Sequence, residues 1–169
     1  MKETNRIWIL GAIGSGKTHF AERLSKKLKI RHYQLDDIYW QKKWTEMRSE
    51  RLRIKMLTKI AKNKHWIIEG VFSDWIEQGI KKADLVIWIE PSISVIIWRL
   101  FVRYIKGKLK GHPEELKAII QMIRLSKAYK KSNGLTYLKH KVLVRKHKLK
   151  VIVVKNNKQL INLLEELDV

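Results

Sequence analysis

The sequence predicts an α/β fold in which helices cover a parallel sheet. Short apolar runs alternate with longer segments whose apolar residues recur at helical spacing, which is typical of a parallel sheet with helical connections. The run that ends at Ile89 is apolar almost throughout, as expected for a strand buried on both faces. A chain of 169 residues is the size of one domain with one core, so we expect residues 1–169 to form a single domain.

Each predicted element follows from a local pattern. The five expected strands are the apolar runs at 7–10, 30–35, 66–68, 84–89 and 151–154. The helices expected from apolar periodicity are 16–28, 46–63, 73–82, 92–106, 114–131 and 157–167. Ser92 is a suitable N-cap for the fourth of these helices. Residues 107–113 are predicted to form a turn, and the pattern in 132–148 does not distinguish helix from loop.

Composition excludes several classes of protein. The chain has no cysteine, which excludes a disulfide framework or thiolate metal site and fits a cytoplasmic location. We find no signal peptide. The longest apolar run, 93–105, contains Arg99 and Arg103 and is too short to cross a bilayer, so we expect no membrane partner.

The strongest functional signal is the glycine-rich segment 11–18, which reads GAIGSGKT and matches the phosphate-loop pattern G-x-x-x-x-G-K-[ST]. It lies between a predicted strand and a predicted helix, as the motif requires. Glycines let the backbone N–H groups approach phosphate oxygens, and the helix N-terminus adds positive potential. The predicted ATP-binding residues are Gly11, Ala12, Ile13, Gly14, Ser15, Gly16, Lys17 and Thr18. Lys17 is expected to reach the β- and γ-phosphates, and Thr18 to offer its hydroxyl to Mg²⁺.

Three carboxylates follow predicted strands, at the sheet edge where ligands bind in such folds. Asp36 directly follows the second strand, and we predict that it contacts the phosphate acceptor as a base or orienting group. Glu69 follows the third strand and is predicted to join Thr18 in the Mg²⁺ shell. Asp37 is equally consistent with a structural cap.

An aromatic cluster follows the Asp pair at Tyr39, Trp40 and Trp44. Such rings can stack on a ligand base or pack in the core where a helix meets the sheet. The core interpretation is slightly favoured by the sequence.

Positive charge is concentrated in one stretch of the chain. The net charge is +21, and residues 99–150 hold sixteen Lys or Arg against only Glu114 and Glu115. Arg99 and Arg103 share one face of a helix, and glycines lie near the turn that follows. We therefore predict a basic helical lid at 99–131 whose two arginines act on the transferring phosphate. A solvated basic face, or a nucleic-acid-binding patch within 99–150, are the alternatives.

At this level of detail the chain resembles the adenylate-kinase-like P-loop kinases, and within them the DNA topology modulation proteins. The segments that carry the resemblance are GAIGSGKTHFAERLSKKLKI, LDDIYW, HWIIEG, ADLVIWIEP and VIVVKN. The resemblance implies a P-loop NTPase fold with strand order 2-3-1-4-5, a lid between the fourth and fifth strands, and ATP with Mg²⁺ as cofactors. It places Glu69-Gly70 where relatives often carry Asp-Gly, and Arg99 and Arg103 where relatives have lid arginines.

Two functions remain open from the sequence. The first is a kinase that moves the γ-phosphate of Mg-ATP onto a small acceptor such as a nucleoside or nucleotide. The second is a nucleic-acid-associated P-loop protein of the DNA topology modulation type, favoured by the basic arm. The chain lacks, after Gly70, the arginine with which nucleotide kinases hold an acceptor phosphate. This departure weighs against a nucleoside monophosphate as acceptor.

Overall fold

A five-stranded, fully parallel sheet forms the centre of the computed structural model, which describes residues 5–42, 45–111, 115–131 and 135–167. The strand order is β2-β5-β1-β6-β7, which is the predicted order 2-3-1-4-5 when only these five strands are counted. The strands are β1 (Arg6–Gly11), β2 (His32–Gln34), β5 (Trp66–Glu69), β6 (Leu85–Ile89) and β7 (Val151–Val154).

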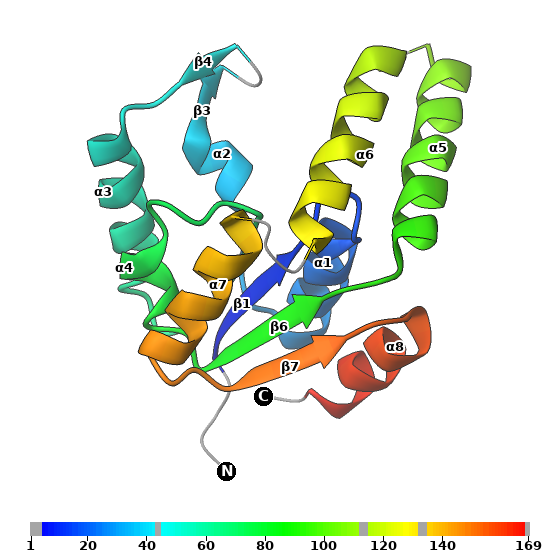
Figure 1. Cartoon of the computed structure of the whole chain (residues 1–169). Helices are drawn as coiled ribbons and strands as arrows, with labels where there is room; N and C mark the ends of the chain where they lie inside the picture. The colour runs from blue at the N-terminus through cyan, green and yellow to red at the C-terminus, as the bar shows by residue number, and fades with distance from the viewer. Residues whose placement is uncertain (1–4, 43–44, 112–114, 132–134, 168–169) are drawn as a thin grey trace.

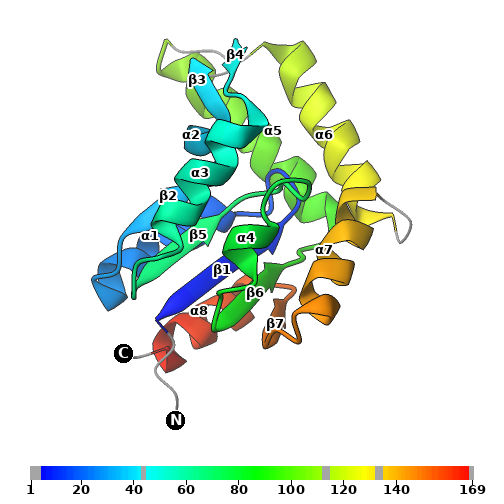
Figure 2. The same cartoon turned by 90° about the vertical axis from the view of Figure 1, so that its left-hand side faces the viewer.

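Helices cover both faces of the sheet (Figures 1 and 2). Side chains alternate along a strand, so in β1 Ile7 and Ile9 join the core under α1 and α8, while Trp8 and Leu10 join the core on the opposite face. That second core also receives side chains from α3, α4 and α7. The covering helices are α1 (Lys17–Leu28), α3 (Glu50–Ile60), α4 (Glu77–Ile80), α7 (Leu135–Lys146) and α8 (Asn157–Glu166).

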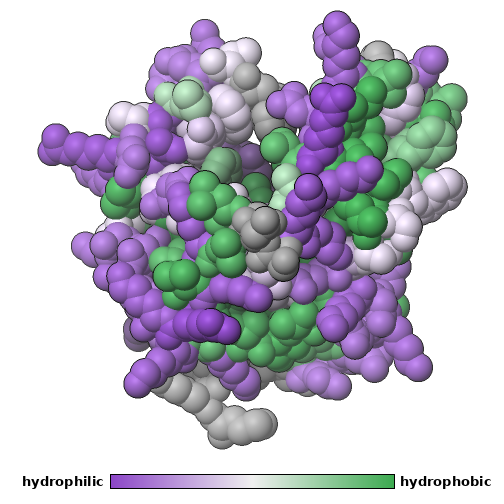
Figure 3. All heavy atoms as spheres, viewed as in Figure 1, coloured by the Kyte–Doolittle hydropathy of each residue, from purple (hydrophilic) through white to green (hydrophobic). Residues whose placement is uncertain are grey.

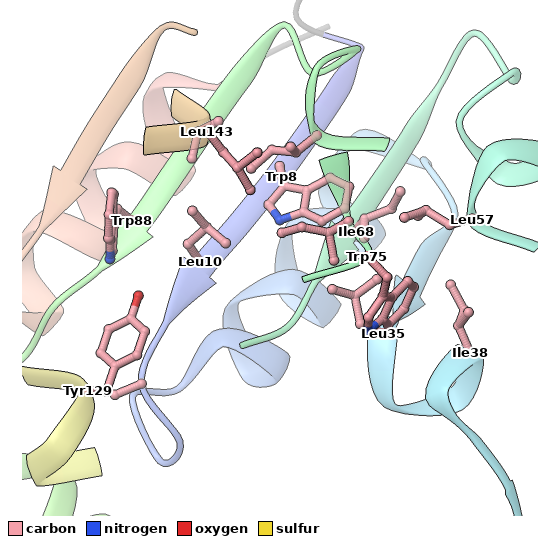
Figure 4. Close-up of a cluster of buried hydrophobic side chains, with 14 of the residues drawn as sticks. Trp8, Leu10, Leu35, Ile38, Leu57, Ile68, Trp75, Trp88, Tyr129 and Leu143 are labelled. Carbon is pink, nitrogen blue, oxygen red and sulfur yellow. The ribbon is translucent and has the colours of Figure 1, made fainter. Parts of the chain in front are cut away.

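Figure 4 shows the second core, whose centre is Trp8. Trp8 is fully buried and meets the ring of Trp66 edge-on, with centroids 6.0 Å apart. Gly79 of α4 lies against this ring, because a Cβ there would come within 2.9 Å of both Trp8 and Leu57. The close approach of α4 to the sheet thus depends on that glycine.

A helical hairpin of α5 (Ile93–Leu109) and α6 (Leu116–Lys130) stands beyond the carboxyl edge of the sheet (Figure 1). Ser92 caps α5 as predicted, accepting a hydrogen bond from the Val95 amide. The helix runs past the predicted end, so Gly107 is helical and was wrongly assigned to the turn. Gly111, with φ of 72°, adopts the left-handed conformation that follows helix ends.

Other boundaries also differ from the prediction. The strand predicted at 30–35 is shorter, because Leu35–Tyr39 form a short helix, α2. The helix predicted at 46–63 begins only at Glu50, since β3 (Trp40–Lys42) and β4 (Glu46–Met47) pair as an antiparallel hairpin.

The structure also differs from the prediction at 73–82 and defines the stretch 132–148 in part. The helix predicted at 73–82 is reduced to α4, and the ambiguous stretch 132–148 contains α7. Trp44 and Glu114, which were part of the predictions, lie outside the described residues. Among the described helices, none combines the length and apolarity needed to span a bilayer.

Candidate functional site

The glycine-rich loop connects β1 to α1 at the carboxyl edge of the sheet. Gly14 and Gly16 have φ of 73° and 96°, which other residues rarely adopt. A Cβ at Gly11 would lie 2.4 Å from the carbonyl oxygen of Ile89, and one at Gly16 would lie 2.9 Å from Arg99 Nη1. The loop therefore requires glycine for both its conformation and its close packing.

Lys17, the first residue of α1, is buried beneath this loop. Its Nζ donates a hydrogen bond to the carbonyl oxygen of Ala12 at 2.8 Å. Burial lowers the pKa of Lys17, and attraction to Glu69 and Asp36 opposes that shift. Both predicted carboxylates are thus near enough to the lysine to influence its charge.

Thr18 and Glu69 lie in direct contact. The Thr18 hydroxyl donates to Glu69 Oε1 at 2.8 Å, and Glu69 is only 2% exposed at the end of β5. The structure thus brings together the two side chains predicted to bind Mg²⁺, as adjacent hydroxyl and carboxylate oxygens.

Asp36 lies in the first turn of α2 and not at a strand end. It is partly buried, whereas the neighbouring Asp37 is exposed. The attraction between Asp36 and Lys17 indicates that the Asp36 carboxylate is close enough to influence the charge of the lysine.

The aromatic residues after Asp37 pack against protein. Tyr39 stacks on Phe72 with ring centroids 4.5 Å apart, and its ring also meets Trp40 edge-on at 4.9 Å. The guanidinium of Arg53 lies over Tyr39 at 4.6 Å and over Trp75 at 5.5 Å. These contacts favour the core interpretation of Tyr39 and Trp40.

The structure separates the two predicted lid arginines. Arg99 Nη1 donates to the carbonyl oxygen of Ser15 in the loop, and its Nη2 donates to Asn157 Oδ1 at 2.6 Å. Burial lowers the pKa of Arg99. Arg103 Nη2 instead lies 2.6 Å from the sulfur of Met122 in α6. Arg99 therefore meets the loop, and the contact seen for Arg103 is within the hairpin.

Two polar residues near the loop were not predicted from the sequence. Ser126 of α6 is fully buried, and its hydroxyl lies within hydrogen-bond distance of two carbonyl oxygens, that of Ile13 at 2.8 Å and that of Met122 at 2.7 Å. His140 of α7 is also fully buried, with Nε2 2.8 Å from the Phe72 carbonyl oxygen and Nδ1 3.1 Å from the Tyr129 hydroxyl. Burial lowers the pKa of His140 to about 4, so its ring is neutral near pH 7.

These contacts fix the hydrogen-bonding roles of the His140 ring. A carbonyl oxygen only accepts, so Nε2 carries the proton and Nδ1 accepts from Tyr129. His140 therefore joins α6, α7 and the segment after β5. No sequence pattern indicated a role for His140, because its partners are distant in the sequence and its own segment had no clear periodicity.

A cavity of about 360 Å³ opens beside the loop. It lies between the loop, the segment after β5, α6 and the start of α7, and Figure 3 shows the surface hollowed between α2 and α6. Most of its lining is apolar, and Ser73, Asp74 and Thr136 add polar groups. The lining residues are Ile13, Val71, Phe72, Ser73, Asp74, Leu125, Ala128, Tyr129, Leu135 and Thr136.

No family model matches the chain. An uncharacterized protein of Bacillus subtilis (strain 168), YqaC, is 36% identical over 110 residues, which cover 62% of this chain. The chain spans 62% of the length of that relative.

Solved structures show the fold. Shikimate kinase from Acinetobacter baumannii has a TM-score of 0.57 at 13% identity, over 96% of this chain and 89% of that one. Shikimate kinase from Bacteroides thetaiotaomicron has a TM-score of 0.56 at 14% identity, over 96% of both chains. A sugar kinase from Janibacter sp. HTCC2649 has a TM-score of 0.56 at 14% identity, over 97% of this chain and 94% of that one.

The chain thus shares the fold of these structures, a five-stranded parallel sheet flanked by helices. At these identities the likeness concerns the fold alone. None of these four proteins is described as a DNA topology modulation protein or by a nucleic-acid partner, so that finer resemblance stays a prediction.

Proposed function

We propose that this chain is an ATP-dependent kinase that transfers the γ-phosphoryl group of Mg-ATP to a hydroxyl of a small acceptor. One observation carries the proposal: the hydrogen-bonded pair Thr18–Glu69 lies beside a glycine-rich loop whose Lys17 is buried beneath it. A hydroxyl, a carboxylate and a lysine gathered at a phosphate loop are the groups that phosphoryl transfer uses.

The nucleotide side of the site is formed by residues 11–18. Their backbone N–H groups and the N-terminus of α1 would hold the phosphates, and Lys17 would place its charge against the β- and γ-oxygens. Thr18 and Glu69 would hold Mg²⁺, which neutralises charge on the phosphates when bound. The fit is supported by the glycine positions, since a Cβ at Gly11 would collide with the Ile89 carbonyl oxygen, and Gly14 and Gly16 have left-handed φ angles.

The acceptor side is the cavity beside Ile13. Its volume of about 360 Å³ falls within the range of small-molecule sites, and its lining offers both apolar surface and hydroxyl groups. Asp36, whose charge influences Lys17, would orient the acceptor hydroxyl and take its proton. A nucleoside, a nucleotide or a small alcohol of similar size are the acceptors considered.

We further propose that α5 and α6 are a lid over this site, within residues 99–131. Arg99 already contacts the loop and would stabilise charge on the transferring group. Arg103, which contacts Met122 within the hairpin, would be a second lid arginine if its side chain reached the transferring group.

A phosphoryl-transfer screen tests the proposal. The protein is incubated with Mg²⁺ and ATP labelled at the γ-phosphate, together with nucleosides, nucleotides, sugars or other small alcohols. We expect label on one class of acceptor with wild type and none with Lys17→Ala. Release of the label only as inorganic phosphate, whatever the acceptor, would contradict a kinase and indicate a hydrolase.

A further inference from the structure

Helix α5 is apolar on two opposite faces. Ile96 and Leu100 are buried, and both approach Gly14 of the glycine-rich loop. Trp98, Phe101, Ile105 and Leu109 are 64%, 50%, 38% and 81% exposed, respectively. We call these four side chains the outer stripe.

The spacing of the outer stripe is helical. Its members follow one another at intervals of three, four and four residues, which places them on one side of an α-helix. Trp98 and Phe101 also touch, with ring centroids 6.1 Å apart. A surface helix normally has one apolar face, and a helix that is apolar on both sides is normally covered on both. Figure 3 shows apolar side chains gathered over this part of the molecule.

Positive charge borders the stripe. At about 100° per residue, Lys108 lies on one flank of the stripe and Lys106 on the other. Both lysines are exposed, and neither α5 nor α6 contains an acidic residue. The chemistry of the surface is therefore an apolar centre with cationic edges.

A second copy of the chain fits this surface poorly. The stripe covers 11 residue steps of one helix, which is a length of about 17 Å. A stable dimer needs a wider surface, because it buries about 800 Å² on each partner. Two copies would also bring together chains that each carry a net charge of +21. A narrow stripe of bulky apolar groups with lysine flanks does not require a shape-matched partner if it enters lipid.

We propose that the outer stripe binds the surface of a bilayer that contains anionic lipids. Trp98, Phe101 and the aliphatic members enter the boundary between headgroups and acyl chains, and Lys106 and Lys108 remain at the level of the lipid phosphates. Aromatic and aliphatic residues on one side, with lysines at its edges, are the composition of helices that lie in this interface.

This surface is separate from the candidate kinase site. In Figure 1, α6 stands between α5 and α7, and the cavity is lined by α6 and α7. Binding of α5 to a bilayer therefore leaves the cavity open, and the proposal does not depend on the proposed activity. It also differs from the sequence-based expectation of no membrane partner, which considered only the length of apolar runs.

Vesicle sedimentation tests the proposal with the full chain. Vesicles of phosphatidylcholine alone are compared with vesicles that also contain phosphatidylglycerol. We expect wild type to sediment with the vesicles that contain phosphatidylglycerol. The triple variant Trp98→Ser, Phe101→Ser, Leu109→Ser should bind these vesicles at least about tenfold more weakly, because apolar contact is lost. Replacing exposed apolar residues elsewhere, Met47→Ser, Val153→Ser and Ile161→Ser, should leave binding unchanged.

Fluorescence quenching by brominated lipids reports insertion. Trp98 is the exposed tryptophan among those that the structure describes. Brominated chains should therefore quench wild type on binding, and the conservative variant Trp98→Phe should keep binding and lose most of the quenching. Binding with no quenching would contradict insertion and indicate adhesion through charge alone.

The remaining outcomes overturn the proposal. Absence of sedimentation with anionic vesicles, or equal loss in the control triple variant, removes the outer stripe as the binding surface. Self-association that depends on Trp98 assigns the stripe to a second copy of the chain. Binding of single-stranded DNA that needs the stripe, without binding to vesicles, assigns it to nucleic acid.

Discussion

The glycine-rich loop and the α5–α6 hairpin meet at the candidate site but are fixed in different ways. The loop is held by its own glycines and by the bond between Lys17 and Ala12, all within a few residues. The hairpin is held to the loop by side chains from far along the chain, Arg99 to Ser15 and Ser126 to Ile13. Local geometry therefore fixes the conformation of the glycine-rich loop, and long-range contacts decide which arginine faces it.

The largest effect is expected at Asp36, which lies outside both regions. In Asp36→Asn the side chain keeps its size but cannot act as a base, so transfer should fall by roughly 10²–10⁴-fold. ATP affinity should stay near that of wild type, as measured by calorimetry. The exposed neighbour provides the matched control, and Asp37→Asn should retain activity. Normal turnover in Asp36→Asn would assign Asp36 a structural role.

A second prediction compares the two arginines of the hairpin. Arg99→Ala removes a cation that contacts the loop, and turnover should fall by roughly a hundredfold, as on loss of other groups that stabilise transition-state charge. Arg103→Ala should cause a smaller loss, because its observed contact is with Met122. Single-turnover kinetics of both variants measure this difference. Equal losses would contradict the different roles assigned to the two arginines.

A third prediction concerns His140, which joins the hairpin to the cavity. Its pKa is lowered to about 4 from 6.5, so the unfolded state binds the proton more tightly. The contribution of the neutral ring is complete above pH 6.5 and is lost as the pH falls toward 4. Lowering the pH from 7.5 to 5 should therefore reduce the free energy of unfolding by about 2 kcal/mol through His140.

Urea unfolding at those two pH values measures this loss. In His140→Gln the pH dependence should decrease by that amount. The same substitution at an exposed histidine, His65→Gln, controls for the change of residue type. An unchanged pH dependence in His140→Gln would contradict the buried neutral state.

The smallest effect is expected at the contact between Ser126 and the loop. Ser126→Ala leaves the Ile13 carbonyl oxygen without this donor, at a cost of about 1 kcal/mol in unfolding free energy. Lys127→Ala, at the neighbouring and exposed position of α6, should change stability much less. If the two variants unfold alike, the hydroxyl of Ser126 contributes nothing to holding α6 on the loop.

The fold was predicted well where local patterns are strong. Apolar runs predicted the strands of the sheet, and the glycine-rich motif predicted the loop at 11–18. The strand order was predicted from the resemblance to P-loop kinases. Predictions were wrong where tertiary contacts override local preference. The β3–β4 hairpin replaces the start of a predicted helix, and it is fastened by Arg48, which donates to the carbonyl oxygens of Asp37 and Ile38.

The candidate site was predictable only in part. Residues of the loop are adjacent in sequence, whereas the cavity is assembled from four distant segments. His140 and Phe72 are 68 residues apart, and no pattern in one sequence links them. The sequence placed Arg99 and Arg103 on one face of a helix. In the structure they are one helical turn apart, and Arg99 contacts the loop whereas Arg103 contacts α6.

Calorimetric titration with Mg-ATP tests the central claim most directly. Wild type should bind with a single site per chain. The affinity of Lys17→Ala should be lower by a factor of at least about ten, because this variant loses the ammonium expected at the β- and γ-phosphates. Lys26→Ala removes an exposed lysine from the same helix and should bind like wild type. Equal affinity in Lys17→Ala and wild type would contradict the assignment of the 11–18 loop as the nucleotide site.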